Sequence, residues 1–513
     1  MADVVLVFPK TGFDIKKVSI DLPLALLSAS SYVAQDHEVK IIDQRLDPQW
    51  ENTLKEELKK EPLVVGVSSL TGPQIEHGIH ASRIVKESGA RSKVIWGGVH
   101  ATLLTEQTVS HPLVDIVVAG EGELTFRDLV AALEKGKDLS DVKGIAFKKD
   151  GRVVRTPPQE PVDLNELPEL PYNLVDVEQY VGSQGRFPQE SARSLIFISS
   201  RGCPWRCTYC CNPRLSQRRW RSMTAEKTYE RVSKLVEKYR LDSITFHDEE
   251  FLVDKNRAEQ AARLIGGKFQ WWIQGRMDLI KKADLDILEK GGLCAVQPGI
   301  ESGAPRILEL IHKGEGVEDF LEANRRMAQT DIRPLYNFMM GFPTETYDEV
   351  MQSVDLSLRL LKENPKAQLS GFYVCVPYPG TDLFDLAIKE GFTIPDSLEG
   401  WASFNRQHLN TPWIQGRLPL FQSIMLTSRF IDSSRLGTRL EAAFQGLPVP
   451  LIRTTMVGRF YRRRWRKRVF QPKFDAAVNR GVLFLFSLSQ TRPVRWLARA
   501  WQRRPWHRVG SAH

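Results

Sequence analysis

The segment Arg201-Gly202-Cys203-Pro204-Trp205-Arg206-Cys207-Thr208-Tyr209-Cys210-Cys211-Asn212 directly follows a strand-like run at Ser194 to Ser199. Cys203, Cys207 and Cys210 form a CxxxCxxC pattern, which places three soft thiolates on one short loop. Such thiolates are the usual protein ligands of iron–sulfur clusters. The spacing therefore predicts a [4Fe-4S] cluster held by three cysteines, with one iron left open to another ligand.

A zinc site or a chance group of thiols is the alternative interpretation of this loop. Structural zinc takes four ligands, usually as two separated pairs, and the chain contains no second CxxC or HxxxH pair. Four of the six cysteines lie within residues 203–211, which favours a metal over a disulfide framework. We interpret Cys211, Cys294 and Cys375 as small apolar residues, although Cys375 at a strand end is placed to face a cavity.

The cysteine loop opens a series of six predicted strands with helices between them. A helix is predicted at Ala225 to Tyr239, where apolar residues recur on one face. The strands are predicted at Ser194 to Ser199, Ser243 to His247, Trp271 to Gln274, Cys294 to Gly299, Pro334 to Met340 and Ser370 to Val376. Six such units predict a partial (β/α)6 TIM-type barrel over residues 191–400, with its chemistry at the strand C-termini.

Residues 1–145 also alternate strands with helices, which predicts a Rossmann-like, flavodoxin-like doubly wound parallel sheet. The strands are predicted at Val4 to Phe8, Val39 to Asp43, Leu63 to Val67, Lys93 to Trp96 and Asp115 to Val118. The helices are predicted at Pro23 to Ala34, Glu51 to Lys60, Gln74 to Ser88 and Glu123 to Lys135. Loops rich in Gly and hydroxyl groups follow three strands, at residues 68–72, 97–102 and 120–123. They are either ordinary turns or a ligand site at the carboxyl edge of the sheet.

Residues 146–190 are predicted to be a Pro-rich linker, and residues 401–513 a basic, mostly helical extension. The net charge of +9 comes from that extension, because Arg453 to Arg508 holds 16 Lys and Arg against one acid, Asp475. The tail also carries Trp496, Trp501 and Trp506. Basic stretches with Trp and Phe suit the anionic surface of a membrane. A solvated basic helix, a subdomain packed on the acidic body, and an RNA-binding tail are the alternatives.

The sequence offers no membrane-spanning run, since its longest apolar stretch is the short segment Gly481 to Ser489. The N-terminus has no basic region before its first strand and no small-residue cleavage site after it. We therefore expect a cytoplasmic protein, peripheral at the inner face of the membrane if the tail binds there.

Five further motifs follow the cysteine loop at predicted strand ends. With that loop, the chain resembles the cobalamin-binding radical S-adenosylmethionine (SAM) family, which includes class B radical SAM methyltransferases and anaerobic Mg-protoporphyrin ester cyclases. The resemblance covers roughly residues 1–400. The motifs are His247-Asp248-Glu249-Glu250-Phe251, Gln274-Gly275-Arg276, Gly299-Ile300-Glu301-Ser302-Gly303, Gly341-Phe342-Pro343-Thr344-Glu345-Thr346 and Pro377-Tyr378-Pro379-Gly380-Thr381.

The resemblance implies residue roles at a SAM site. Asp248 and Glu249 would meet the SAM amino group, Arg276 would join the site, and Glu301 with Ser302 would meet the ribose or methionine end. Taken singly, these acids would be solvated loop charges, and residues 301–303 a helix cap.

The resemblance also implies cobalamin at the Gly-rich loops of the N-terminal domain. No DxHxxG string occurs in the chain, so we expect cobalamin without a histidine on cobalt, or a domain that binds none. His77, His80 and His100 are then interpreted as hydrogen-bonded residues. The implied contacts are Ser68, Thr71, Gly72, Gly97, Gly98, His100, Gly120, Glu121 and Gly122.

The expected chemistry begins with one electron from the cluster, which cleaves SAM to methionine and a 5′-deoxyadenosyl radical. In the family's methyltransferases, methylcobalamin then methylates an unactivated carbon and a second SAM restores it. Oxidative cyclisation or rearrangement without methyl transfer, and RNA modification, are the alternatives. The expected partners are a small, lipid-soluble substrate and an electron donor such as flavodoxin or ferredoxin.

Overall fold

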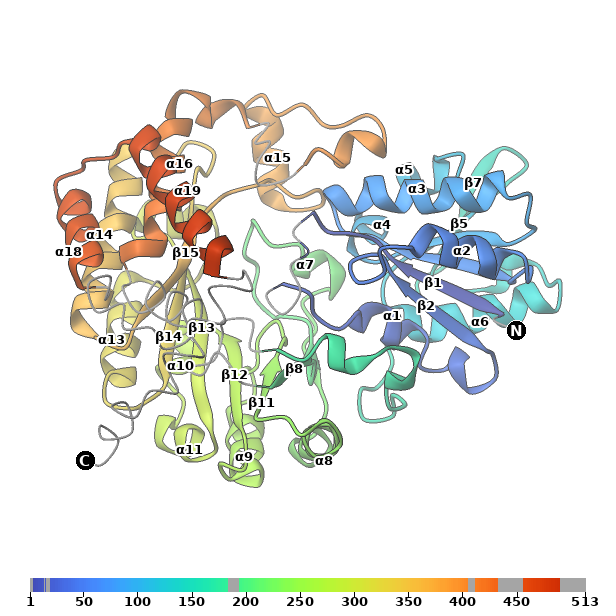
Figure 1. Cartoon of the computed structure of the whole chain (residues 1–513), viewed down its shortest axis with the longest axis horizontal. Coiled ribbons are helices and arrows are strands. Elements are labelled where there is room, and N and C mark those ends of the chain that lie inside the picture. The colour runs from blue at the N-terminus through green and yellow to red at the C-terminus, as the bar shows by residue number, and fades with distance from the viewer. Residues whose placement is uncertain are drawn as a thin grey trace. The chain divides into compact units, whose positions relative to one another are not determined.

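The computed structural model describes residues 3–12, 14, 19–182, 193–404, 411–431 and 455–489 (Figure 1). The chain divides into two compact units. The first comprises Met1–Trp271 and Val376–Thr411, and the second comprises Trp272–Cys375 and Pro412–His513.

The N-terminal sheet of the first unit has the strand order β2-β1-β3-β4-β5-β6-β7. Its first five strands are parallel, which confirms the doubly wound class. The strands are β1 (Val4–Phe8), β2 (Val39–Asp43), β3 (Val64–Ser68), β4 (Lys93–Gly97) and β5 (Ile116–Val118). Every residue of β3 and β5 is buried, as expected of strands covered on both faces.

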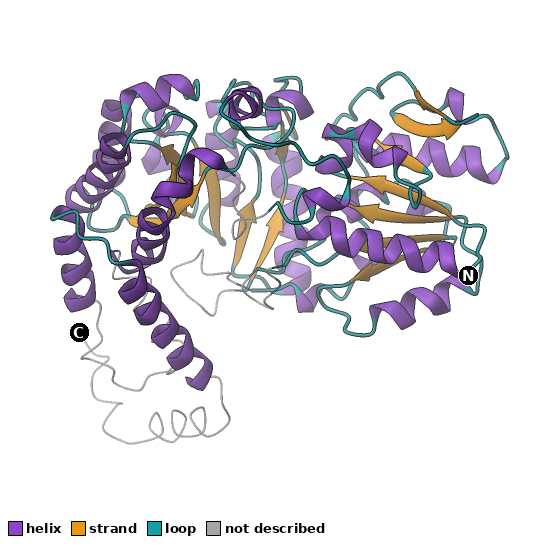
Figure 2. Ribbon diagram, turned by 90° about the horizontal axis from the view of Figure 1, so that it is seen from above, coloured by secondary structure: helices purple, strands orange, loops and turns teal. Residues whose placement is uncertain are grey.

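Helices cover both faces of this sheet (Figure 2). On one face α1 (Leu24–Ala29) packs against α6 (Gly122–Glu134), and on the other α2 (Trp50–Leu58) packs against α3 (Pro73–Glu87). Helix α1 is shorter than predicted. The sequence prediction also missed two short helices after β4, α4 (Val99–Leu103) and α5 (Thr105–Ser110), which the non-helical backbone of Leu104 separates.

A hairpin extends the sheet into the segment that the sequence predicted to be a linker. Strands β6 (Ile145–Lys149) and β7 (Arg152–Arg155) add to β5 in antiparallel order. The turn is Asp150-Gly151, and both residues have positive φ (52° and 75°), as a tight two-residue hairpin requires. The linker prediction is therefore wrong for residues 146–155, where the Asp-Gly signal was overlooked beside the prolines that follow. Farther on, the hydroxyl of Tyr180 donates to Asp43 at 2.9 Å and ties this segment to β2.

The second sheet has the strand order β15-β14-β13-β12-β11-β8. Pairs β8–β11, β13–β14 and β14–β15 are parallel, and the consecutive order confirms the predicted (β/α)6 class. The strands are β8 (Ser194–Phe197), β11 (Ser243–Phe246), β12 (Gln270–Gly275), β13 (Leu293–Glu301), β14 (Arg333–Met340) and β15 (Gln368–Val374).

Local sequence sets where the helices of this series begin and end. The α8 helix (Ala225–Tyr239) starts where the Thr224 hydroxyl accepts from the amide of Lys227, and it ends at the left-handed residue Arg240. The other helices are α7 (Asn212–Leu215), α9 (Lys255–Ile265), α10 (Met277–Ile280), α11 (Leu285–Lys290), α12 (Pro305–Leu310), α13 (Val317–Met327), α14 (Tyr347–Glu363) and α15 (Asp382–Lys389).

The described part of the C-terminal extension is helical. Helix α16 (Leu418–Ile431) packs on β15 and contacts α18 (Thr455–Arg466) and α19 (Pro472–Ser489). No helix within the described ranges has the length and apolar character needed to cross a membrane. The tail tryptophans Trp496, Trp501 and Trp506 lie outside the described residues.

Candidate active site

The cysteine motif forms a loop between the short strand β9 (Ser200–Arg201) and α7. Gly202 has a φ of 86°, and a Cβ there would overlap the carbonyl oxygen of Arg219, so only glycine fits. The Cys210 amide donates to the Cys207 carbonyl at 3.1 Å, which tightens the turn. Cys203, Cys207 and Cys210 are all half-buried. Burial raises the pKa of the Cys210 thiol to about 12.

The donor set fits an iron–sulfur cluster. Cys203 and Cys207 lie close enough to Cys210 to act on its thiol electrostatically. Within the described residues, no three His, Cys, Asp or Glu side chains converge on a point that would hold one metal ion. A four-iron cluster binds each thiolate at a different iron, so its ligands stand farther apart than those of a single ion. Three neighbouring thiols on one loop match the ligand spacing of such a cluster. Cys211 is a fourth thiol on the same loop.

Asp248, two residues past the end of β11, fixes the segment that leads into the cysteine loop. Its carboxylate accepts from the Ser199 amide at 2.7 Å and from the Ser199 and Ser200 hydroxyls at 2.6 Å each. Arg257 donates to the Ser199 hydroxyl at 2.6 Å. Burial raises the pKa of Asp248 above its ordinary value, against the lowering effect of Arg257 and the donors. Asp248 is fully buried, and both oxygens of its carboxylate accept hydrogen bonds from the chain, so neither is exposed at the surface.

Glu249 differs from its neighbour because it is exposed. Its carboxylate accepts from the amide of Gly202 at 3.2 Å, immediately before Cys203. Of the two acids predicted to meet the SAM amino group, Glu249 is therefore the one that the structure places at the surface of the cysteine loop.

The other predicted SAM residues lie in the second unit, within a chain of buried charges. Lys313 lies 3.4 Å from both Glu301 and Glu315, and Glu315 lies 3.5 Å from Arg276. Arg276 also donates to Asp278 at 2.9 Å. The sequence prediction missed Lys313 and Glu315, whose only sequence signal is the charged, Gly-rich string Lys313-Gly314-Glu315-Gly316.

Glu301 occupies a strained backbone position at the end of β13. Its φ is 62°, and the pairing of β13 with β14 is irregular between Gly299 and Glu301. A Cβ on Gly299 would collide with the Glu301 carboxylate, which folds back over it. Ser302 is fully buried, and its hydroxyl accepts from the Ala304 amide at 3.1 Å, just before α12. Ser302 thus stabilises this turn, whereas strain at Glu301 is typical of functional sites.

The Gly-rich loops of the N-terminal sheet are tied together at its carboxyl edge. The Ser69 hydroxyl donates to the Gly97 carbonyl at 2.8 Å, and a Cβ on Gly98 (φ 95°) would strike the backbone of Ser69. The Thr102 hydroxyl accepts from the Gly120 amide at 3.0 Å. The structure thus brings the three predicted loops into one continuous edge.

Part of this edge is open and part is covered. A Cβ on Gly120 would meet nothing within 4 Å, and the Leu70 side chain is 46% exposed. Open backbone beside an exposed apolar side chain fits a flat macrocycle. A Cβ on Gly72, by contrast, would lie 3.1 Å from the Phe404 carbonyl oxygen, and Gly122 packs near Ala29 within the fold. Ser68 is buried in register with Gly97 at the strand ends.

His100 is enclosed by the chain. Its Nδ1 lies 3.0 Å from the Thr71 hydroxyl, and its ring packs edge-on against Trp401 at 5.9 Å. Burial lowers the pKa of His100 to about 4, so the ring is neutral at physiological pH. The bond also engages Thr71, which was predicted to contact cobalamin.

Glu121, another predicted cobalamin contact, is engaged in ion pairs with the start of the barrel. It pairs with Arg201 at 2.9 Å and with Arg221 of β10 (Arg221–Ser222). Arg201 also pairs with Glu123 at 2.6 Å. Burial raises the pKa of Glu123, but the Arg201 guanidinium and the hydrogen bonds to the carboxylate lower it by more, so the pKa lies below its ordinary value. Sequence patterns gave no signal for these long-range pairs.

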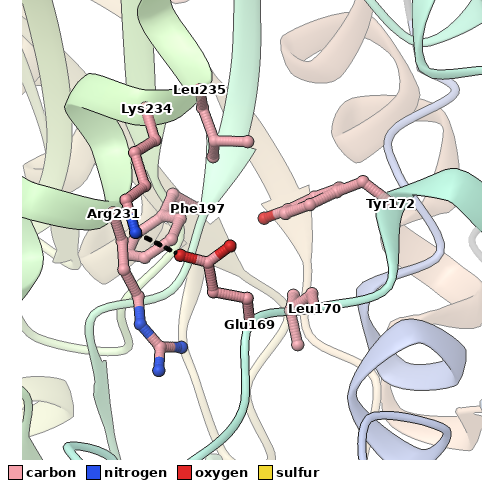
Figure 3. Close-up of a pocket in the computed structure, with 7 residues that line it drawn as sticks. All are labelled: Glu169, Leu170, Tyr172, Phe197, Arg231, Lys234 and Leu235. Carbon is pink, nitrogen blue, oxygen red and sulfur yellow. Dashed lines mark hydrogen bonds and ion pairs between the residues drawn. The ribbon is translucent and has the colours of Figure 1, made fainter. Parts of the chain in front are cut away.

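A small cavity lies elsewhere in the first unit (Figure 3). Its volume is about 30 Å³, which suits water and excludes a substrate or cofactor. The Lys234–Glu169 ion pair, at 2.6 Å, lies at its side. Its lining is Glu169, Leu170, Tyr172, Phe197, Arg231, Lys234 and Leu235.

A three-cysteine loop after the first strand of a (β/α)6 sheet, joined to a doubly wound domain with an open Gly-rich edge, defines a radical SAM enzyme with a corrinoid-binding domain. Residues 197–357 match the model of the Radical SAM superfamily, and residues 9–130 match that of the B12 binding domain. An uncharacterized methyltransferase of Pyrococcus horikoshii is 32% identical over 399 residues, which cover 76% of this chain and 84% of that protein. The chain belongs to the cobalamin-binding radical SAM family.

Two further comparisons agree with this assignment. The anaerobic magnesium-protoporphyrin IX monomethyl ester cyclase of Rubrivivax gelatinosus is 25% identical over 68% of this chain, which spans 62% of that enzyme. The fold is shared with the radical SAM methyltransferase TsrM of Kitasatospora setae, solved with cobalamin and a [4Fe-4S] cluster. That match has a TM-score of 0.64 and 18% identity, and it covers 90% of this chain and all of TsrM. The cofactors of the family are a [4Fe-4S] cluster, SAM and cobalamin, as predicted.

Proposed function

We propose that the protein methylates an unactivated carbon of a hydrophobic small molecule, such as an isoprenoid, a hopanoid or a tetrapyrrole. The observation that supports this proposal most is the pair of contacts from Arg201 to Glu121 and Glu123. Arg201 stands two residues before Cys203, and the two acids stand at the start of α6, beside Gly120. A direct link between the cysteine loop and the corrinoid edge suits a reaction that needs both.

When bound, the cluster with SAM supplies radical initiation and the corrinoid supplies a methyl group. The chain holds these groups in place. Cys203, Cys207 and Cys210 would ligate the cluster, while Asp248 and Arg257 fix the strand ahead of them. The backbone of the Gly97 and Gly120 loops would support the corrinoid with no histidine on cobalt. An electron donor such as flavodoxin or ferredoxin would reduce the cluster.

A methyl transfer is favoured over cyclisation by the similarity to the uncharacterized methyltransferase of Pyrococcus horikoshii, which extends over 76% of this chain and 84% of that protein. Oxidative cyclisation without methyl transfer is the second candidate, favoured by the similarity to the porphyrin ester cyclase. We infer a hydrophobic substrate from the basic, aromatic C-terminal helices, because such helices suit a membrane surface and hydrophobic substrates reside in membranes.

The two candidates differ in what they consume and produce. Protein reconstituted under anaerobic conditions is incubated with SAM, a reductant and candidate lipids, and the products are analysed by mass spectrometry. Methyl transfer predicts a mass gain of one methylene, with both S-adenosylhomocysteine and 5′-deoxyadenosine formed. A product that forms with 5′-deoxyadenosine but without the mass gain would contradict methylation and support cyclisation.

A further inference from the structure

The outer face of the two C-terminal helices is strongly basic. On α18 the exposed residues Arg459, Arg463 and Arg466 recur at helical spacing and share one side, and the exposed Lys467 follows directly after the helix. On α19 the exposed residues Lys473 and Arg480 do the same. Among the described residues, none of these six cations forms an ion pair with an acid.

The single acid of these helices is withdrawn from that face. Asp475 is fully buried, and it pairs with Arg464 and accepts from the Ser423 hydroxyl. Arg468 pairs with Asp355 at the edge of the two helices. The remaining charge on the outer face is therefore positive throughout.

Two phenylalanines project from this basic face. Phe460 of α18 is 48% exposed and Phe474 of α19 is 45% exposed. Their rings lie 6.3 Å apart, so the two helices join in one apolar projection. The guanidinium of Arg464 lies 5.6 Å from the Phe460 ring and 5.3 Å from the Phe474 ring, which holds the rings in place.

The inner face explains why this projection is rigid. The Trp465 indole donates to the Thr427 hydroxyl of α16 at 2.8 Å, and Tyr461 stacks on Phe430 at 5.2 Å. Both side chains are buried, so α18 cannot turn its phenylalanine inward without losing these contacts. Phe460 thus stays exposed because the opposite side of α18 packs against α16.

We infer that this face, formed by Phe460, Phe474 and the six cations, docks on an anionic membrane surface. Exposed aromatic side chains enter the interface while Lys and Arg attract anionic headgroups. Single-stranded nucleic acid would instead need separate rings on which successive bases stack, whereas these two rings contact each other edge-on. The surface stands on its own contacts and does not depend on the reaction that the enzyme catalyses.

Flotation of the full-length protein tests this inference. With vesicles of phosphatidylcholine and phosphatidylglycerol, the protein is expected to float at low salt, and to be released at about 1 M salt, where charge screening reaches about 3 Å. Vesicles of phosphatidylcholine alone should retain little protein. Each cation near the surface contributes about fivefold to partitioning, so the triple variant R459Q/R463Q/R466Q should bind on the order of 100-fold more weakly.

Matched variants test whether vesicle binding depends on this face or only on the overall charge and exposed apolar residues of the protein. Phe460→Ser with Phe474→Ser should weaken vesicle binding by roughly tenfold or more. The controls I388S/I394S and K135Q/K137Q/K143Q change exposed residues of the same kind elsewhere and should float like the parent protein. All variants should keep the parent circular dichroism and SAM cleavage, because none touches the cysteine loop. If the triple variant does not fold, the vesicle binding of the double variant F460S/F474S tests the inference.

Three results would overturn the inference. The full-length protein stays at the bottom of the gradient with anionic vesicles at low salt. The phenylalanine variant floats as well as the parent. The protein binds a single-stranded RNA with higher affinity than the vesicles, which would assign the face to nucleic acid. A loss of SAM cleavage with flotation intact would count against the proposed function alone.

Discussion

The guanidinium of Arg201 lies 2.6 Å from the carboxylate of Glu123, and the two residues come from segments 78 positions apart in the chain. The Ser28 hydroxyl completes the group, since it donates to Glu123 at 2.5 Å and accepts from Arg201 at 2.9 Å. The backbone of Arg201 leads directly into Gly202 and Cys203. This contact therefore joins helix α6 of the N-terminal domain to the loop expected to hold the cluster.

Removing one partner of this pair should be costly. Arg201→Gln leaves the Glu123 carboxylate buried without its cation, which should lower the free energy of unfolding by about 3 kcal/mol. The double variant R201Q/E123Q should recover part of the loss, because no charge is left unpaired. Urea unfolding of the three proteins measures the effect.

The matched control is Arg91→Gln, which breaks an exposed pair with Glu61 and should change stability little. The same variants test the link to the cofactors, since R201Q should also lower the cobalt content of the reconstituted protein relative to R91Q. Equal unfolding free energies for R201Q and R91Q would contradict a structural role for the pair.

Glu345 predicts a pH dependence of stability. Burial raises its pKa to about 7, although the amides of Gly341 and Phe342 donate to it and lower the pKa. Between pH 4.5 and 7 the folded state then holds a proton that the unfolded state has lost. The free energy of unfolding should therefore fall as the pH rises through this window, by about 3 kcal/mol from this group.

Glu345→Gln cannot ionise, so it should remove this slope and unfold at higher urea concentrations than the parent above pH 7. Glu318→Gln, at an exposed position in the same unit, is the control and should keep the parent profile. A parent protein whose stability is flat or rises from pH 5 to 7, with the same profile in E345Q, would show that Glu345 titrates normally.

The enclosed His100 bears on how cobalt is held. Because His100 is fully buried, with its Nδ1 at the Thr71 hydroxyl and its ring packed on Trp401, we expect that it does not ligate cobalt. The EPR spectrum of the Co(II) form should lack hyperfine splitting from a histidine nitrogen, and His100→Asn and His77→Gln should leave that spectrum unchanged. Nitrogen splitting that disappears in either variant would identify a histidine ligand.

Local patterns predicted the elements well, and long-range contacts explain what they missed. The helix Ala225–Tyr239 was predicted to the residue because its cap and apolar stripe are both local. The hairpin at Asp150-Gly151 was missed because β7 is mostly exposed and lacks an apolar pattern. Within the site, the cysteine spacing was visible in one loop. The Lys313–Glu301 and Arg201–Glu123 pairs join distant segments, which no periodicity reports.

The predicted role of Asp248 shows a second limit. An acid at a strand end has the same sequence pattern whether it meets a ligand or the backbone beside it. Only the structure shows that Ser199 and Ser200 take up its carboxylate while Glu249 stays exposed.

The measurement that tests the account most directly is anaerobic reconstitution of the full-length protein, followed by iron, sulfide and corrinoid analysis and an assay for 5′-deoxyadenosine. We expect about four irons and one corrinoid per chain, and reductive cleavage of SAM. Cys203→Ala, Cys207→Ala and Cys210→Ala should each abolish the cluster absorption and the cleavage, while Cys211→Ala should retain the cluster. A full cluster in the triple variant C203A/C207A/C210A, or a parent protein that holds a cluster but leaves SAM intact, would contradict the account.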